Sequence, residues 1–346
     1  MALIPTTILT GFLGSGKTTL LKRILQEPHG HKIAVIENEF GEESIDNDIL
    51  IQDSKEQIVE MNNGCICCTV RGDLIMALTE LSQKRNSGLL DFDHVIIETT
   101  GLANPGPVAQ TFFMDEEVAV HYLLDSIITV VDAKHGMQQL DAYEEAQRQV
   151  GFADRLLLSK TDLVDEPQAN ALKERLKRIN PRASVHAAHF GEMPIAEILD
   201  IRGFNLNEKL HIDPEFLADE EAEHVHHDCS EHCDHHDHDH SDHSSQHTDG
   251  ISAFAFKSTR PFDVNRLDEF LGYLVQVYGP NMLRYKGVLF MDGGERKVVF
   301  QGVHQMMGTD IGAKWEKNET RESKMVFIGK DLPKSIFISG LEQCLV

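Results

Sequence analysis

Residues 11–18 read Gly-Phe-Leu-Gly-Ser-Gly-Lys-Thr, and this stretch decides the fold. It matches in full the pattern GxxxxGK followed by Ser or Thr. It also follows the apolar run TTILT at 6–10 and precedes an amphipathic stretch over Thr18–Gln26. Glycines at these positions let backbone N–H groups converge on phosphate oxygens, and the start of the following helix adds a partial positive charge. The pattern predicts a phosphate-binding loop between a strand and a helix.

This loop supplies most of the expected nucleotide contacts. Lys17 is expected to reach the β- and γ-phosphates and to act in catalysis, while the hydroxyl of Thr18 is expected to bind Mg²⁺. The residues of the loop expected to bind the nucleotide are Gly11, Gly14, Ser15, Gly16, Lys17, Thr18 and Thr19.

A second nucleotide element follows at residues 94–101, HVIIETTG. An apolar strand ends there in a carboxylate, Glu98, which can hold Mg²⁺ through water or orient the attacking water. The backbone N–H of Gly101 is placed to sense a γ-phosphate. Glu98 is therefore the second predicted catalytic residue, after Lys17.

A base-reading element is predicted at Ser159-Lys160-Thr161-Asp162, which ends another apolar run. The carboxylate of Asp162 can accept from guanine N1–H and N2–H₂ together. Adenine offers neither donor, so the same carboxylate would lose its partners, and Asp162 predicts GTP over ATP. Lys160 is expected to lie along the base. Ser159 stands where such motifs usually carry Asn.

The fold class follows from the alternation of apolar runs with helical patterns up to about residue 205. Continuous Val, Ile and Leu runs between helices indicate a mainly parallel sheet covered on both faces, which is a doubly wound α/β domain of the P-loop NTPase class. The predicted strands are 6–10, 32–37, 94–98, 126–132 and 154–159, and the predicted helices include 18–26, 73–84 and 167–179.

The composition then divides the chain. Residues 1–210 form the predicted P-loop domain, 211–250 an acidic His-rich linker without enough apolar residues to fold, and 251–346 a smaller C-terminal α+β domain. In the last of these we expect a strand at 251–258, a helix capped by Asp263, a hairpin around the GGE turn, a strand at 323–330 and a helix opened by Pro333.

A thiol cluster precedes the helix expected near Asp73. Cys65, Cys67 and Cys68 lie within four residues, and thiols beside a helix start favour soft or borderline metal ions. Zn²⁺ prefers four ligands, so a further ligand is needed. The local candidates are acids of the segment that follows the second predicted strand, namely Glu37, Glu39 and Glu42. Buried packing cysteines are the alternative interpretation.

Together, the GFLGSGKTT loop, ENEFGE, GCICC, IIETTGLANP and SKTD resemble the CobW-type metallochaperone GTPases, and within them the YjiA-type subgroup. The resemblance extends to RYKGVLF and FQGVHQ near the C-terminus. It implies a Mg-GTP-dependent metal insertase with weak intrinsic turnover that binds metal at the CxCC motif. Zn²⁺ is the commonest metal in that family, with Co²⁺ or Ni²⁺ in related cases. The partner implied is an apo-metalloprotein client.

The linker adds a second group of metal ligands. Imidazoles interleaved with carboxylates form a mobile, low-specificity binder for Zn²⁺, Ni²⁺ or Co²⁺, which we interpret as a loading or buffering arm. The arm is represented by His224, His226, His227, His232, His235, His236, His238 and His240.

Charge and cysteine usage limit the partners and the location. The formal net charge of −24 argues against nucleic acid and anionic membrane, because phosphate contacts need clustered Lys and Arg. The sequence shows no apolar stretch of membrane-spanning length and no basic signal segment. Closely spaced cysteines that would make strained disulfides indicate reduced thiols and a cytoplasmic protein. The oligomeric state stays open, a homodimer included.

Three functions remain in competition. The first is a GTP-hydrolysing metallochaperone whose metal affinity depends on its nucleotide. The second is a P-loop enzyme, such as a kinase or ATPase, with a structural metal. The third is a metal store built around the His-rich arm.

Overall fold

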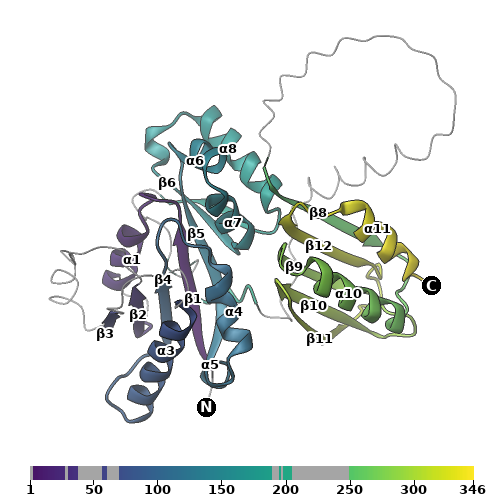
Figure 1. Cartoon of the computed structure of the whole chain (residues 1–346), viewed down its shortest axis with the longest axis horizontal. Helices are drawn as coiled ribbons and strands as arrows, with labels where there is room; N and C mark the ends of the chain where they lie inside the picture. Colours follow the sequence, from purple (N-terminus) through teal and green to yellow (C-terminus); the bar gives the residue numbers. More distant parts are fainter. Residues whose placement is uncertain are drawn as a thin grey trace, which may run out of the picture.

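The computed structural model describes residues 3–27, 30–37, 57–60, 70–188, 195, 198–204 and 249–346. Two sheets organise this part of the chain (Figure 1). The N-terminal sheet has seven strands in the order β3-β2-β4-β1-β5-β6-β7, and every neighbouring pair is parallel. Its strands are β1 (Ile4–Gly11), β2 (Ile33–Glu37), β3 (Gln57–Glu60), β4 (His94–Glu98), β5 (Tyr122–Asp132), β6 (Arg155–Ser159) and β7 (Ser184–Ala187).

Helices cover both faces of this sheet, as the run of fully buried Ile, Leu and Val residues in its strands requires. Apolar side chains of α1 pack on one face, and those of α3, α4, α7 and α8 pack on the other. The helices of the domain are α1 (Lys17–Gln26), α3 (Val70–Asn86), α4 (Gly106–Met114), α5 (Glu116–His121), α6 (Gly136–Ala142), α7 (Glu144–Phe152) and α8 (Glu166–Ile179), with a short 3₁₀ turn η1 (Thr161–Leu163). The predicted doubly wound domain is confirmed.

The C-terminal domain is an antiparallel five-stranded sheet in the order β11-β10-β9-β12-β8. Two helices pack on it, and the side chain of Asp263 caps the first of them by accepting from the N–H groups of Asn265 and Arg266. The elements are β8 (Ile251–Ser258), α10 (Val264–Tyr278), β9 (Met282–Leu289), β10 (Arg296–Val303), β11 (Met306–Lys314), β12 (Ser323–Lys330) and α11 (Lys334–Gln343). The predicted α+β domain is confirmed.

Some elements were absent from the sequence prediction. Strand β11 extends the expected hairpin to three strands, but its glycines and exposed polar residues give no strand pattern. Helices α4 to α7 were missed because they are short and lie between longer apolar runs. The domain boundary near residue 210 lies outside the described residues and stays a prediction.

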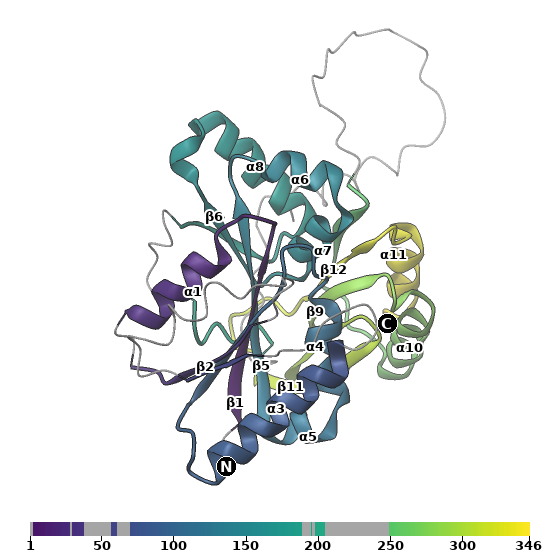
Figure 2. The same cartoon turned by 60° about the vertical axis from the view of Figure 1, so that its left-hand side comes forward.

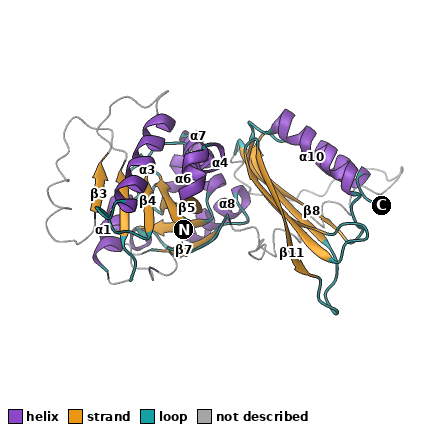
Figure 3. Ribbon diagram, turned by 90° about the horizontal axis from the view of Figure 1, so that it is seen from below, coloured by secondary structure: helices purple, strands orange, loops and turns teal. Residues whose placement is uncertain are grey.

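The two domains share an apolar interface. Buried residues of β8, β9, β10 and β12 join the same core as residues of α4, α7 and α8. Figures 2 and 3 show α4 and α7 between the two sheets, with α10 on the face of the C-terminal sheet that is turned away from the first domain. In the described parts of the chain, no helix is both long and apolar enough to cross a bilayer.

A buried ion pair crosses this interface. A guanidinium nitrogen of Arg284 lies 2.8 Å from a carboxylate oxygen of Asp154, and both side chains are almost fully buried. Asp154 also accepts from the backbone N–H of Ile127 at 2.9 Å, and Arg182 lies 3.8 Å away. Burial lowers the pKa of Arg284 to about 10, although Asp154 opposes the shift. One carboxylate thus pairs with two arginines at the junction of the domains.

We predict that Asp154→Asn lowers the free energy of unfolding by roughly 3–5 kcal/mol, because it leaves buried arginine charge without its partner. Urea unfolding followed by circular dichroism measures the change. Glu80→Gln is the control, since its ion pair with Lys84 is exposed and contributes little. Equal unfolding midpoints for the two variants would contradict the role of this pair.

Candidate nucleotide and metal site

The phosphate loop lies between β1 and α1, where close backbone packing dictates glycine. At Gly11, φ is +150°, and a Cβ would lie 2.3 Å from the carbonyl oxygen of Val130 in β5, so no side chain fits. Gly16 takes a left-handed conformation with φ of +94° and caps α1. Lys17, the first residue of that helix, therefore lies directly after the loop.

Side chains hold the loop's carbonyl groups. Each carbonyl oxygen from Gly11 to Ser15 accepts a hydrogen bond from a lysine, glutamine or serine side chain. The N–H groups of Phe12 and Ser15 donate to Val130 O and Phe12 O, both at 3.1 Å. Turning the carbonyls toward the side-chain donors leaves other N–H groups of the loop for an anion. The bonds run from Lys17 Nζ to Gly11 O (3.1 Å) and Phe12 O (3.2 Å), from Gln139 Nε2 to Leu13 O (3.0 Å), from Lys160 Nζ to Gly14 O (2.8 Å) and from Ser159 Oγ to Ser15 O (2.7 Å).

The catalytic candidates meet at the ends of β1 and β4. Thr18 Oγ1 donates to Glu98 Oε1 at 3.0 Å, and Glu98 is 9% exposed. Burial lowers the pKa of Lys17, and the nearby Glu98 opposes the shift. A hydroxyl and a carboxylate beside a phosphate loop are the hard oxygen ligands that Mg²⁺ prefers. The residues present therefore fit a Mg²⁺ held by Thr18 and Glu98, where the ion would neutralise phosphate charge.

Gly101 lies directly against the phosphate loop. A Cβ on Gly101 would lie 2.6 Å from the Cα of Leu13 and 2.9 Å from its backbone nitrogen, so only glycine permits this contact. The preceding Thr99 donates from its hydroxyl to Thr10 Oγ1 at 2.8 Å, which ties the end of β4 to β1. The segment after Glu98 thus sits where it can respond to a γ-phosphate.

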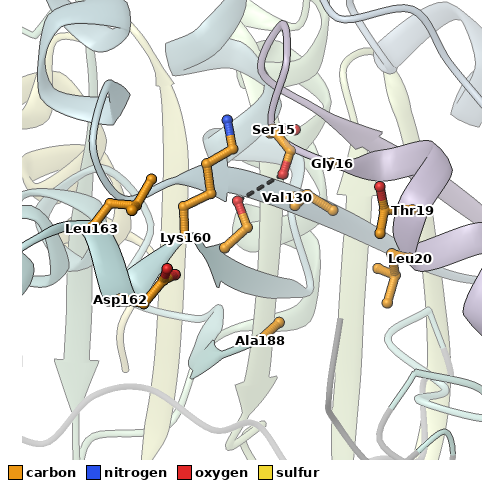
Figure 4. Close-up of a pocket in the computed structure, with 10 residues that line it drawn as sticks. Ser15, Gly16, Thr19, Leu20, Val130, Lys160, Asp162, Leu163 and Ala188 are labelled. Atoms are coloured by element: carbon orange, nitrogen blue, oxygen red, sulfur yellow. Dashed lines mark hydrogen bonds between the residues drawn. The ribbon is translucent and has the colours of Figure 1, made fainter. Parts of the chain in front are cut away.

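The predicted base-reading residues Ser159, Lys160 and Asp162 line a cavity of about 400 Å³ beside the loop (Figure 4). In Figure 4, Lys160, Asp162 and Leu163 lie on one side of this space, with Gly16, Thr19 and Leu20 across from them. The cavity is lined by Ser15, Gly16, Thr19, Leu20, Val130, Ser159, Lys160, Asp162, Leu163 and Ala188.

Asp132 supports the base-reading lysine and was missed from the sequence. Its carboxylate, 1% exposed as a residue, lies 2.7 Å from Lys160 Nζ and 3.1 Å from His135 Nδ1. Burial alone would raise the pKa of Asp132, but the hydrogen bonds from Lys160 and His135 outweigh it and lower the pKa. The available signal was the acid that ends the apolar run of β5.

Ser159, which stands where similar motifs usually carry Asn, contacts the phosphate loop. Its hydroxyl donates to Ser15 O at 2.7 Å and approaches Val131 O at 3.3 Å. The shorter side chain therefore still ties the base-reading turn to the phosphate loop.

Three glutamates end neighbouring strands in register. In the parallel pairing of β3, β2 and β4, Glu60 lies opposite Glu37, and Glu37 lies opposite Glu98. Strand β2 ends at Glu37, and Glu39 and Glu42 follow it in the sequence. The thiol segment follows Glu60 and ends before α3. The strand that precedes the acidic segment is thus the direct neighbour of β4, and the strand that precedes the thiol segment is one strand further out.

The predicted metal ligands themselves fall largely outside the described residues, and only the backbone of Glu37 is placed, at the end of β2. Within the described part, no group of three or more His, Cys, Asp or Glu residues could hold a metal ion. The ligands outside it are Glu39, Glu42, Cys65, Cys67, Cys68, His224, His226, His227, His232, His235, His236, His238 and His240.

Two family models match the chain. The model for the CobW/HypB/UreG nucleotide-binding domain matches residues 5–187, and the model for the cobalamin synthesis protein cobW C-terminal domain matches residues 251–345. The chain belongs to the CobW/HypB/UreG family. This membership confirms the predicted family, the P-loop fold with its appended domain, and the GTPase class.

Two bacterial relatives in this family match over nearly their whole lengths. Zinc chaperone YjiA of Escherichia coli K12 is 41% identical over 96% of this chain and 95% of its own, and zinc chaperone CobW of Pseudomonas aeruginosa is 35% identical over 100% and 92%. The crystal structure of Zn(II)-bound YjiA GTPase from E. coli has a TM-score of 0.77 and 36% identity, with both chains fully covered. A variant of YjiA with one glutamate and two cysteines replaced by alanine also crystallised with Zn(II) (TM-score 0.77, 35% identity, both chains fully covered).

We predict that Asp162→Asn lowers GTP affinity by about 100-fold and raises affinity for xanthosine triphosphate, because the amide can donate to the xanthine 2-oxygen. Isothermal titration with both nucleotides measures the exchange.

Asp165→Asn is the matched control, since Asp165 caps α8 and asparagine caps equally well. Unchanged preference in the Asp162 variant would show that another group reads the base.

Proposed function

We propose that this CobW-family chain is a GTP-hydrolysing metallochaperone that binds Zn²⁺ at Cys65, Cys67 and Cys68 with help from the acids after β2. It transfers the metal to an apo-protein client, and its affinity for Zn²⁺ depends on the bound nucleotide. The relatives named as zinc chaperones support zinc as the cargo. Thiolate and carboxylate donors suit Zn²⁺, and Co²⁺ or Ni²⁺ are the alternatives.

The observation that carries this proposal is the register of Glu60, Glu37 and Glu98 across three adjacent strands. Glu98 contacts Thr18 at the start of α1, so it belongs to the nucleotide site. The other two glutamates end the strands from which the acidic and thiol segments leave. A change at the γ-phosphate and a change in metal binding therefore act on backbone attached to the same sheet edge.

The described residues suit slow GTP hydrolysis. The loop N–H groups and Lys17 bind and orient the phosphates, and Glu98 orients the attacking water. Asp162 selects guanine, and Lys160 holds the base-reading turn against the loop. Mg²⁺, when bound, supplies the positive charge that stabilises the γ-phosphoryl group as it transfers.

Cellular context completes the proposal. Free thiols at the metal site require a reducing compartment, so we place the protein in the cytoplasm. The His-rich arm loads or buffers metal with lower specificity than the thiol site. The client is a metalloprotein in its metal-free form.

We predict that Zn²⁺ binds at least roughly tenfold more tightly with a non-hydrolysable GTP analogue than with GDP, in line with usual coupling free energies. Competition with a chromophoric zinc chelator, in the presence of Mg²⁺, measures both affinities. Lys17→Ala should abolish the difference because it weakens phosphate binding.

Two further variants locate the site. Replacing all three thiols by serine should remove the tight site, whereas deleting residues 220–248 should remove only weaker binding. Equal Zn²⁺ affinities with both nucleotides would reject the coupling, and loss of nearly all metal on deletion of the arm would favour a store.

A further inference from the structure

A buried glutamine holds the segment that carries Gly101. Gln149 of α7 is fully buried, and its Nε2 lies 2.9 Å from Ala103 O and 3.3 Å from Gly101 O. Its backbone carbonyl accepts from Thr129 Oγ1 of β5 at 2.8 Å, which fixes the helix to the sheet. Gly101 in turn packs on Leu13 of the phosphate loop. Gln149 therefore helps to set the position of this segment relative to the phosphate loop.

The same helix packs against the C-terminal domain. A Cβ on Gly151 would lie 2.8 Å from Leu283 Cδ1 of β9 and 3.3 Å from Ile251 Cγ2 of β8. The next residue, Phe152, meets the ring of His304 edge-on at 5.3 Å between centroids. Helix α7 thus contacts the Gly101 segment through Gln149 and the C-terminal domain through Gly151 and Phe152.

The far end of the Gly101 segment touches the C-terminal domain directly. Gly106 begins α4, and its backbone N–H donates to Asn104 Oδ1 at 3.0 Å. A Cβ on Gly106 would lie 2.8 Å from His304 Nε2 and 2.8 Å from the Phe152 ring. His304 is 9% exposed and has φ of +51°, a conformation that fixes it at the β10–β11 turn. The segment from Gly101 to Gly106 is therefore held between the phosphate loop and the second domain.

We propose that Gln149 is a positioning residue for GTP binding and hydrolysis, and that its helix and the Gly106–His304 contact make the C-terminal domain part of the nucleotide switch. Segments that sense a γ-phosphate have two arrangements, and any contact that favours one of them changes nucleotide preference. By linkage, a ligand or client that shifts the C-terminal sheet changes GTP affinity, and GTP changes affinity for that partner by the same factor. This inference rests on the nucleotide site proposed above and does not depend on zinc transfer.

The test is the ratio of GDP to GTP-analogue dissociation constants in the full-length chain with Mg²⁺. Gln149→Met has similar length but no donor, so the ratio should fall about tenfold through weaker analogue binding alone, as expected for two lost hydrogen bonds. Gln139→Met is the matched control. Gln139 supports Leu13 O in the phosphate loop, which both nucleotides use, so its loss should weaken both and leave the ratio unchanged.

The contact between the domains is tested with His304→Ala. This variant should lower the same ratio of dissociation constants by about threefold, which is less than the usual coupling between allosteric sites. Tyr273→Ala, on the exposed side of α10, should leave it unchanged. If thermal melting shows that the His304 variant is unfolded, Gly106→Ala replaces it, because its methyl group displaces His304.

The possible results separate the claims. A ratio unchanged by Gln149→Met would overturn the positioning role, and a ratio unchanged in a folded His304 or Gly106 variant would overturn the link to the C-terminal domain. Failure of the wild-type chain to bind either nucleotide would overturn the nucleotide site, and with it the proposed function.

Discussion

The structure depends on the hydrogen bonds that hold the carbonyl groups of the phosphate loop. Donors from α1, α6 and the base-reading turn reach this short loop from different directions, so its N–H groups are arranged before any phosphate arrives. Such preorganisation removes much of the ordering cost of nucleotide binding. The same hydrogen bonds connect the loop, the base-reading turn and α6 in one network, so a change in the position of one of them alters the hydrogen bonds of the others.

The parallel sheet brings this network and the other predicted site elements to one edge. The neighbouring strands of the sheet are parallel, so their carboxyl ends lie on the same side. The phosphate loop, Glu98 and the base-reading turn therefore lie together although they are far apart in the sequence. Strands β2 and β3, which precede the acidic and thiol segments in the sequence, end at that edge as well. On the opposite side of the nucleotide elements, α4 and α7 pack on the C-terminal domain, which gives the chain two regions that nucleotide state can influence.

The sequence predicts those parts whose chemistry is local. The phosphate loop, the strand ending in Glu98, the base-reading turn and the cap at Asp263 each combine a short motif with its neighbouring pattern, and the structure places them on the expected elements. Asp132, Gln139 and Gln149 could not be identified in this way, because an acid or amide in a short helix or strand gains its role only from tertiary contacts. The thiols and the His-rich arm remain predictions from sequence and family.

Whether nucleotide turnover drives metal transfer can be measured in a single-turnover time course. The chain is loaded with GTP and one equivalent of Zn²⁺, then mixed with Mg²⁺ and an excess of a zinc-responsive dye as acceptor, while a phosphate sensor follows hydrolysis in parallel. If turnover drives transfer, Zn²⁺ will reach the dye at the rate of phosphate release and will stay bound to the chain when a non-hydrolysable analogue replaces GTP. Zinc transfer at one rate with GTP and with the analogue would contradict this mechanism.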